Sequence, residues 1–138
     1  MTRPMTHTTF AAALAVALGT AALAAPAHAG GSISVTVTPT NADEAQAMRT
    51  GLALYSVVNG FTSGSGIRQI GFGNAAGLVQ NGSGNVGVVH QQGSGHTGTL
   101  SQNGNGNAHG LFQFGNNTDS HVVQNGDGNT GATFVFGF

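Results

Sequence analysis

The stretch SGSGIRQIGFGNAAGLVQ, residues 63–80, holds the first two copies of a pattern that repeats through the rest of the sequence. Glutamine recurs in it at an unbroken spacing of 11 residues. These glutamines are Gln69, Gln80, Gln91, Gln102, Gln113 and Gln124. A fixed period of this kind indicates a repeat architecture, in which each unit buries its apolar face by stacking on its neighbours.

Glycines fall in register between the glutamines, and five of the six linkers read Gly-x-Gly. The linker glycines are Gly71, Gly73, Gly82, Gly84, Gly93, Gly95, Gly104, Gly106, Gly115, Gly126 and Gly128. Glycine adopts positive φ angles without a steric penalty, so each linker is expected to form a tight turn. The segments between the turns are seven residues long, which is a usual length for a strand.

Alternate residues of a strand lie on one face, and the first, third, fifth and seventh positions of the segments repeat better than the others. The seventh position is glutamine, the first is mostly asparagine, the third is mostly small and the fifth is aliphatic. The asparagines are Asn74, Asn85, Asn107 and Asn129, and the aliphatic residues are Ile67, Leu78, Val89, Leu100, Leu111 and Val122. We predict that this face is the interior and that its amides bond to one another in ladders.

A chain that alternates strands and tight turns at a fixed length predicts an all-β fold, a two-sheet β-solenoid. Each half-coil has 11 residues and each coil has 22. Coils would stack at about 4.8 Å, and the two edges of the stack would carry unpaired backbone groups, which soluble proteins normally block. No proline follows Pro39, and residues 133–138 are apolar and uncharged. Both ends of the stack are therefore expected to be open to extension.

Residues 63–80 resemble the repeat of the curlin family, the subunits of bacterial curli fibres, in the pattern Ser-x5-Gln-x-Gly-x-Gly-Asn-x-Ala-x3-Gln. The resemblance covers residues 63–138, although later units depart from it. His96 and Thr118 replace the asparagine, and Val135 replaces the glutamine. His109 stands where a small residue is usual, and Asn117 replaces a turn glycine.

The resemblance implies a structural subunit of extracellular, functional amyloid fibres, exported through the periplasm of a Gram-negative bacterium to its surface. Such fibres support cell adhesion, aggregation and the biofilm matrix. The implied partners are further copies of the same chain, a nucleator subunit and an outer-membrane curli-type secretion pore.

The amino-terminal residues 1–29 are typical of an export signal. Arg3 precedes an apolar run from Phe10 to Ala25, and Ala27-His28-Ala29 has the small-x-small form of a signal-peptidase site. The run is shorter than the roughly 20 residues that a membrane-spanning helix needs. We expect cleavage between Ala29 and Gly30 and a secreted mature chain without a membrane span.

Residues 30–62 differ from the repeats in composition. Alternation in residues 32–38 predicts a strand that Pro39 ends. Asn41 followed by Glu44 predicts a helix start, with a helix from about 42 to 58. Three interpretations remain open: an element recognised in secretion or by a nucleator, a cap over the first coil, or a segment left disordered in a chain that is exported unfolded.

The composition excludes several classes of protein. The 138 residues include 24 glycines, three basic side chains and no cysteine. Disulfide frameworks, thiolate metal sites and basic nucleic-acid-binding surfaces are therefore excluded. The expected mature chain carries two arginines and four acids, a net charge of −2, which leaves little self-repulsion to oppose association.

The ionisable side chains suggest no chemistry. His90, His96, His109 and His121 occupy different positions in their segments, and only His96 and His109 are expected to face each other across the core. This scatter favours packing roles over a metal site. The four acids form no recurring set with serine or histidine, so we expect neither an enzyme nor a cofactor.

The competing hypothesis is a soluble, secreted β-solenoid that binds ice or carbohydrate. Such a surface needs a regular outward array. The outward positions here are Arg68, Val79, His90, Ser101, Phe112, Val123 and Phe134. Because this array is irregular, the sequence favours the fibre subunit.

Overall fold

The structure is a computed structural model that describes residues 30–61 and 64–138. The expected export signal, residues 1–29, lies outside this range, and Gly30 is the first described residue. No helix in the described range is long and apolar enough to cross a membrane. The elements are β1 (Ser32–Val37), α2 (Ala42–Val58), β2 (Gly66–Ile70), β3 (Ala75–Asn81), β4 (Val86–Ser94), β5 (Thr97–Asn103), β6 (Ala108–Asn116), β7 (Asp119–Asn125) and β8 (Thr130–Gly137).

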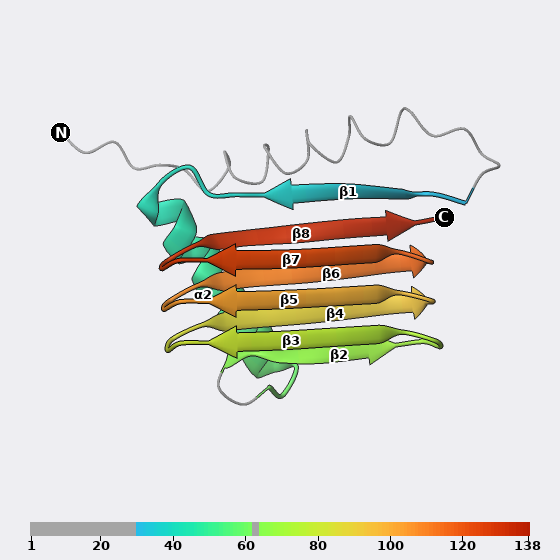
Figure 1. Cartoon of the computed structure of the whole chain (residues 1–138), viewed down its shortest axis with the longest axis horizontal. Coiled ribbons are helices and arrows are strands. Elements are labelled where there is room, and N and C mark those ends of the chain that lie inside the picture. The colour runs from blue at the N-terminus through green and yellow to red at the C-terminus, as the bar shows by residue number, and fades with distance from the viewer. Residues whose placement is uncertain (1–29, 62–63) are drawn as a thin grey trace.

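Strands β2 to β8 form the predicted two-sheet β-solenoid, with successive strands placed alternately in the two sheets (Figure 1). The larger sheet has the order β1-β8-β6-β4-β2, and the smaller has the order β3-β5-β7. All pairs between repeat strands are parallel and join residues 22 apart, as in Leu78 opposite Leu100 and Leu100 opposite Val122. The prediction of 22-residue coils is therefore confirmed.

A thin apolar layer lies between the two sheets. Val89, Leu100, Leu111 and Val135 are almost fully buried there, and Leu78 is among the partly buried residues that pack against them. These four residues come from the inward faces of their strands. In the smaller sheet Leu78, Leu100 and Val122 lie directly above one another, and in the larger sheet Leu111 lies above Val89. The stack axis is thus also the axis of the core.

The predicted helix is confirmed as α2, Ala42–Val58, and its start is capped as expected. The Asn41 side chain accepts a hydrogen bond from the Glu44 backbone N–H at 2.9 Å, and Glu44 Oε2 accepts one from Thr40 N at 2.8 Å. These bonds satisfy orphan donors of the helix start. Leu52 is buried where α2 contacts β4, β6 and β8.

The N-terminal segment links opposite ends of the stack (Figure 1). With 17 residues, α2 is about 25 Å long, enough to cross the five-stranded sheet, whose outermost strands lie about 19 Å apart. The helix thereby connects β1, beside β8 on one edge, to β2 on the other.

The position of β1 corrects two expectations from the sequence. β1 pairs antiparallel with β8, from Ser32 opposite Gly137 to Val37 opposite Ala132. The proposed cap over the first coil is therefore wrong, because the strand covers the last half-coil instead. The expectation of two open ends is wrong for β8 as well. A physical reason lies in the outward faces of the two strands, where Ile33 and Val35 are opposite the aromatic residues of β8.

Candidate functional site

The inward glutamines form two ladders parallel to the stack axis. In the larger sheet, Gln69 Nε2 donates to Gln91 Oε1 and Gln91 Nε2 donates to Gln113 Oε1, each at 2.8 Å. In the smaller sheet, the Nε2 atoms of Gln80 and Gln102 donate to the next glutamine at 2.7 and 2.8 Å, and Gln124 is the last acceptor. Every bond points the same way, so each ladder has a donor end and an acceptor end.

The same amides also hold the two sheets together. Gln91 Nε2 donates to the carbonyl of Ala75 at 2.9 Å, and Gln102 Nε2 donates to that of Val86 at 3.1 Å. In the part of the chain that the structure describes, no buried side-chain nitrogen or oxygen lacks a hydrogen-bond partner. Burial of so many amides is tolerated because each one is satisfied.

The asparagines at the first position tie each turn to the next coil. Asn85 Nδ2 donates to Gly104 O at 2.9 Å, while its Oδ1 accepts from Asn107 N at 2.9 Å. Asn74 and Asn107 make equivalent pairs of bonds, and Asn129 completes the column as a donor to Asn107. Where His96 replaces asparagine, its Nδ1 bonds to Thr118 Oγ1 at 2.7 Å. All the turn glycines named above have positive φ.

The aliphatic column loses burial toward the edges of the stack. Val89, Leu100 and Leu111 are at most 1% exposed, whereas Ile67 in the edge strand β2 is 38% exposed. Leu78 and Val122 are half-buried. The partly exposed Ile67 is an apolar inward residue that no further coil covers among the described residues.

His96 and His109 do not pair across the core, as the sequence had suggested they could. His109 Nε2 bonds to Thr133 Oγ1 at 3.0 Å, and its Nδ1 accepts from Gln124 Nε2 at 3.3 Å. This arrangement fits a neutral ring with its proton on Nε2. Within residues 30–61 and 64–138, no three ligand-type side chains gather in a group that could hold a metal ion.

Burial lowers the pKa of His109 to about 4. An unfolded histidine titrates near 6.5, so between these values the unfolded chain binds more protons, and stability falls as the pH falls from 6.5 toward 4. The expected loss is about 3 kcal/mol. Urea unfolding at several pH values should show this slope, and His109→Ser, which matches the small residues found at this position, should flatten it. A variant with the wild-type slope would contradict this role of His109.

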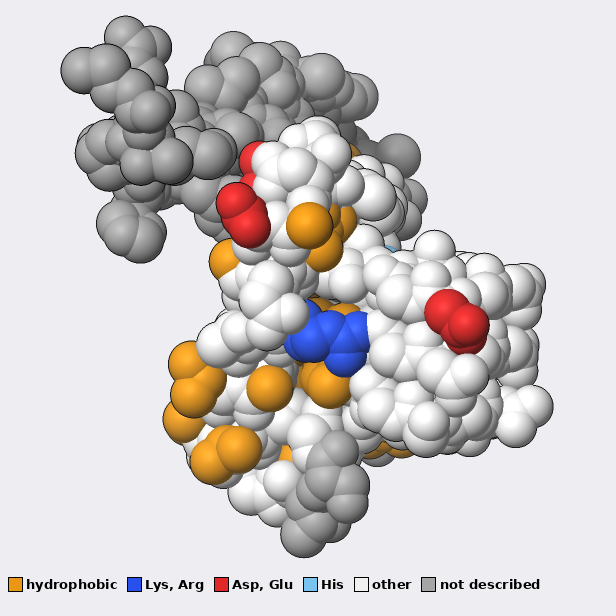
Figure 2. Space-filling model, turned by 90° about the vertical axis from the view of Figure 1, so that its left-hand side faces the viewer, with side chains coloured by type: hydrophobic (Ala, Val, Ile, Leu, Met, Phe, Trp, Pro, Cys, Tyr) orange, Lys and Arg blue, Asp and Glu red, His pale blue; other side chains and the backbone are white. Residues whose placement is uncertain are grey.

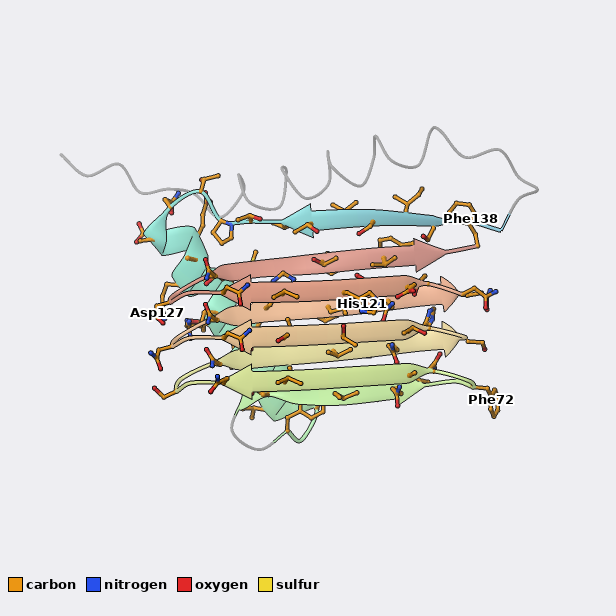
Figure 3. The ribbon with its side chains drawn as sticks, viewed as in Figure 1. Phe72, His121, Asp127 and Phe138 are labelled. Atoms are coloured by element: carbon orange, nitrogen blue, oxygen red, sulfur yellow. The ribbon has the colours of Figure 1, made fainter. Side chains whose placement is uncertain are left out.

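Two acidic residues lie on the last coil. Asp127, in the turn before β8 (Figure 3), accepts a hydrogen bond from Asn105 N at 2.6 Å, as Asn105 itself does from Ser83 N at 3.0 Å. Asp119 pairs with His121 at 3.0 Å on the exposed face of β7. Asp127 therefore keeps the bonding of an asparagine while adding a charge at the edge of the stack.

The charge of Asp127 is expected to slow stacking of further chains. Asp127→Asn preserves the bond from Asn105 and removes the charge, so it should shorten the lag before fibre formation. Asp43→Asn is the matched control, because it makes the same change of net charge in the first turn of α2. Thioflavin T kinetics would measure both variants. An unchanged or longer lag for Asp127→Asn, or equal shortening by both, would contradict a local role.

The sequence prediction missed a column of aromatic residues on the outward face of the larger sheet. The rings of Phe112 and Phe134 stack at 5.0 Å, and those of Phe114 and Phe136 stack at 5.5 Å. Tyr55 of α2 packs edge-on against Phe112. The signal was visible as phenylalanines 22 residues apart at outward positions.

One edge of the last coil remains open. β7 has no partner beyond β5 among the described strands, whereas β8 in the facing sheet is covered by β1. An open groove of about 710 Å³ lies along β7, lined by Val122 and Gln124 of β7, His109 and Thr133 of the facing sheet, and Thr36 of β1. β2 and β3 form the opposite edge of the stack.

Comparisons with known proteins give no assignment: no family model, no curated protein and no solved structure matches this chain.

Proposed function

We propose that this chain is a structural subunit of extracellular, curli-like functional amyloid fibres, and that it assembles by edge-to-edge stacking of its β-solenoid coils. The observation that carries the proposal is the pair of glutamine ladders. Their bonds run along the stack axis, and they repeat the arrangement that identical chains adopt in cross-β fibres. A ladder inside one chain is therefore a template for the same ladder between chains.

The edges of the stack support growth by addition of copies. Gln124 Nε2, the last donor of its ladder, makes only long contacts of 3.4 Å to Ala108 O and 3.3 Å to His109 Nδ1. At the other edge, Ile67 is partly exposed. The turns at one end of the strands carry few charged side chains (Figure 2), and the charged residues of the whole range 64–138 are Arg68, Asp119 and Asp127. Little repulsion therefore opposes contact between copies.

The remaining parts of the proposal follow from the resemblance to curlins and from the export signal expected in residues 1–29. The chain would leave the cell through an outer-membrane secretion pore and be templated by a nucleator subunit. In the fibre it would support adhesion, aggregation and the biofilm matrix.

The alternative, a soluble module that binds ice or carbohydrate, receives less support from the surface. The outward positions His90 and Phe112 contact Tyr55 of α2, so part of that face is occupied within the chain. On the other sheet, the outward residues Val79, Ser101 and Val123 differ in chemistry. Neither face offers the regular rows of one residue type that such binding needs.

Seeded growth tests the proposal. Residues 30–138 would be purified from denaturant, desalted and followed by thioflavin T fluorescence with and without fragments of their own fibres. We expect a lag that the fragments abolish. The contrary result is a soluble, β-rich monomer whose fluorescence stays flat even when such fragments, or any preformed aggregate, are added. It would contradict self-assembly and favour the soluble solenoid.

A further inference from the structure

The number of half-coils determines how a second copy can continue the stack. The repeat strands β2 to β8 begin and end in the same sheet, because seven strands alternate between two sheets. The next half-coil after β8 therefore belongs in the other sheet, on top of β7. A second copy supplies that half-coil with its first strand, β2, only if it is turned by half a revolution about the stack axis.

The turned copy matches the open groove at two inward positions. Continuing the repeat places Ile67 of the second copy over Val122, and Gln69 over Gln124. The partly exposed Ile67 would then be covered by an aliphatic neighbour. Gln124 Nε2 would gain the glutamine acceptor that its ladder lacks, because Gln69 uses only its Nε2 in the ladder of its own chain. In this arrangement the donor end of the ladder in the first copy meets the acceptor end of a ladder in the second copy.

The turns are consistent with the same rotation. Phe72 and Asp127 lie in turns at opposite ends of the strands (Figure 3). Half a revolution brings the Phe72 turn of the second copy over the Asp127 turn of the first. Phe72, which is 86% exposed in the single chain, would then lie against the neighbouring copy.

The strand β1 occupies the next position that this copy needs. After β2 has added to β7, the β3 strand of the same copy should add to β8, where β1 now lies. β1 cannot continue the ladders itself. It runs antiparallel, and its inward residues Ser34 and Thr36 are opposite Val135 and Thr133 without an amide or an aliphatic side chain. It therefore ends the larger sheet, whereas the smaller sheet stays open.

We propose that the groove along β7 is the docking site for β2 of a second copy, turned by half a revolution, and that β3 of this copy then displaces β1 from β8. The incoming copy binds first to the open strand β7. β1 then acts as a plug, by which we mean a strand that covers β8, must be displaced before β3 can pair there, and so slows growth. This inference rests on the proposed fibre function and adds the contact, the rotation and the step that controls them.

A reversible lock on β1 tests the proposal. Thr36 Oγ1 and Thr133 Oγ1 are 3.0 Å apart, and the two residues are directly opposite each other. Gly31 and Phe138 form a hydrogen-bonded pair, because each backbone N–H donates to the other residue's carbonyl. Hydrogen-bonded and non-hydrogen-bonded pairs alternate along antiparallel strands, so Thr36 and Thr133, five positions further along, form a non-hydrogen-bonded pair. Such pairs have Cα atoms about 4.5 Å apart, within the range of a disulfide. The chain has no other cysteine, so Thr36→Cys/Thr133→Cys gives one defined bridge.

We expect the oxidised double variant to give no seeded thioflavin T growth in the time that the wild type needs to finish, and the reduced form of the same protein to grow. The wild type, with and without reductant, controls for the reductant. If the oxidised and reduced forms grow at the same rate, displacement of β1 is not needed for growth, and the proposal is overturned while the fibre function stands. A wild type that fails to grow on seeds would instead contradict the fibre function itself.

A second pair of variants loosens the plug without a disulfide. Val35 belongs to a hydrogen-bonded pair with Phe134, so Val35→Pro removes a bond between β1 and β8. The N–H of Ser34 points away from β8, so Ser34→Pro is the matched control. We expect Val35→Pro to shorten the unseeded lag at least about twofold relative to Ser34→Pro. Equal lags for the two variants, or a longer lag for Val35→Pro, would overturn the proposal.

Discussion

Replacing Gly93 with alanine is expected to destabilise the chain by more than about 3 kcal/mol, because the turn has no room for a β-carbon. Gly93 has a φ angle of 131°, which lies outside the left-handed helical region that other residues tolerate. A β-carbon there would overlap the backbone carbonyl of Gly115 in the turn of the next coil. Neither backbone can move away without disrupting the stacking of the turns of successive coils. Urea unfolding followed by circular dichroism would measure the loss.

The matched control lies at the second glycine of another turn. Gly128 has a φ angle of 72°, and a β-carbon there would meet nothing within 4 Å. Asn117 already occupies the equivalent place in the preceding turn, with a φ angle of 51°. Gly128→Asn should therefore change the stability by less than about 1 kcal/mol. Similar stabilities for Gly93→Ala and Gly128→Asn would contradict the account of the turns.

The second large effect is expected at the buried glutamines. Gln91 is fully buried and joins three partners: its Nε2 donates to Gln113 and Ala75, and its Oε1 accepts from Gln69. Gln91→Leu leaves these polar groups without a partner inside the stack. An unsatisfied buried group costs about 1–3 kcal/mol, so we expect a total loss of at least about 3 kcal/mol.

The neighbouring glutamine provides the control for this substitution. Gln92 points to the outward face and is exposed, so Gln92→Leu should change the free energy of unfolding by no more than about 0.5 kcal/mol. Both variants would be compared with the wild type in urea at protein concentrations where the chain stays monomeric. Equal effects at the two positions would mean that the ladder adds little to the stability of the coil.

The repeat block could be predicted from the sequence because its period determines its register. An 11-residue spacing places Gln80, Gln102 and Gln124 in one column whatever the surrounding structure, and the parallel pairing follows. The signal for the helix start was equally local, since Asn41 and Glu44, which cap it, lie three residues apart. Signals of this kind depend on neighbours in the sequence.

The partner of β1 could not be predicted, because edge pairing is a choice between distant strands. The alternation of Ile33, Val35 and Val37 suits any sheet edge with an apolar face. The choice of β8 depends on the column that Phe134 and Phe136 continue, which exists only once the coils are stacked. The partners of His109 were missed for a similar reason, since Thr133 lies one coil further along the same sheet.

The mass per unit length of the fibres tests whether the chains stack end to end as intact solenoids. If the chains stack end to end as solenoids, each copy contributes seven half-coils and occupies about 17 Å of fibre axis. Electron-microscopic mass measurement on unstained fibres should then give one chain per about 17 Å in each filament. One chain per about 4.8 Å, the spacing of chains stacked flat in register, would contradict the account, because the coils would have opened before assembly.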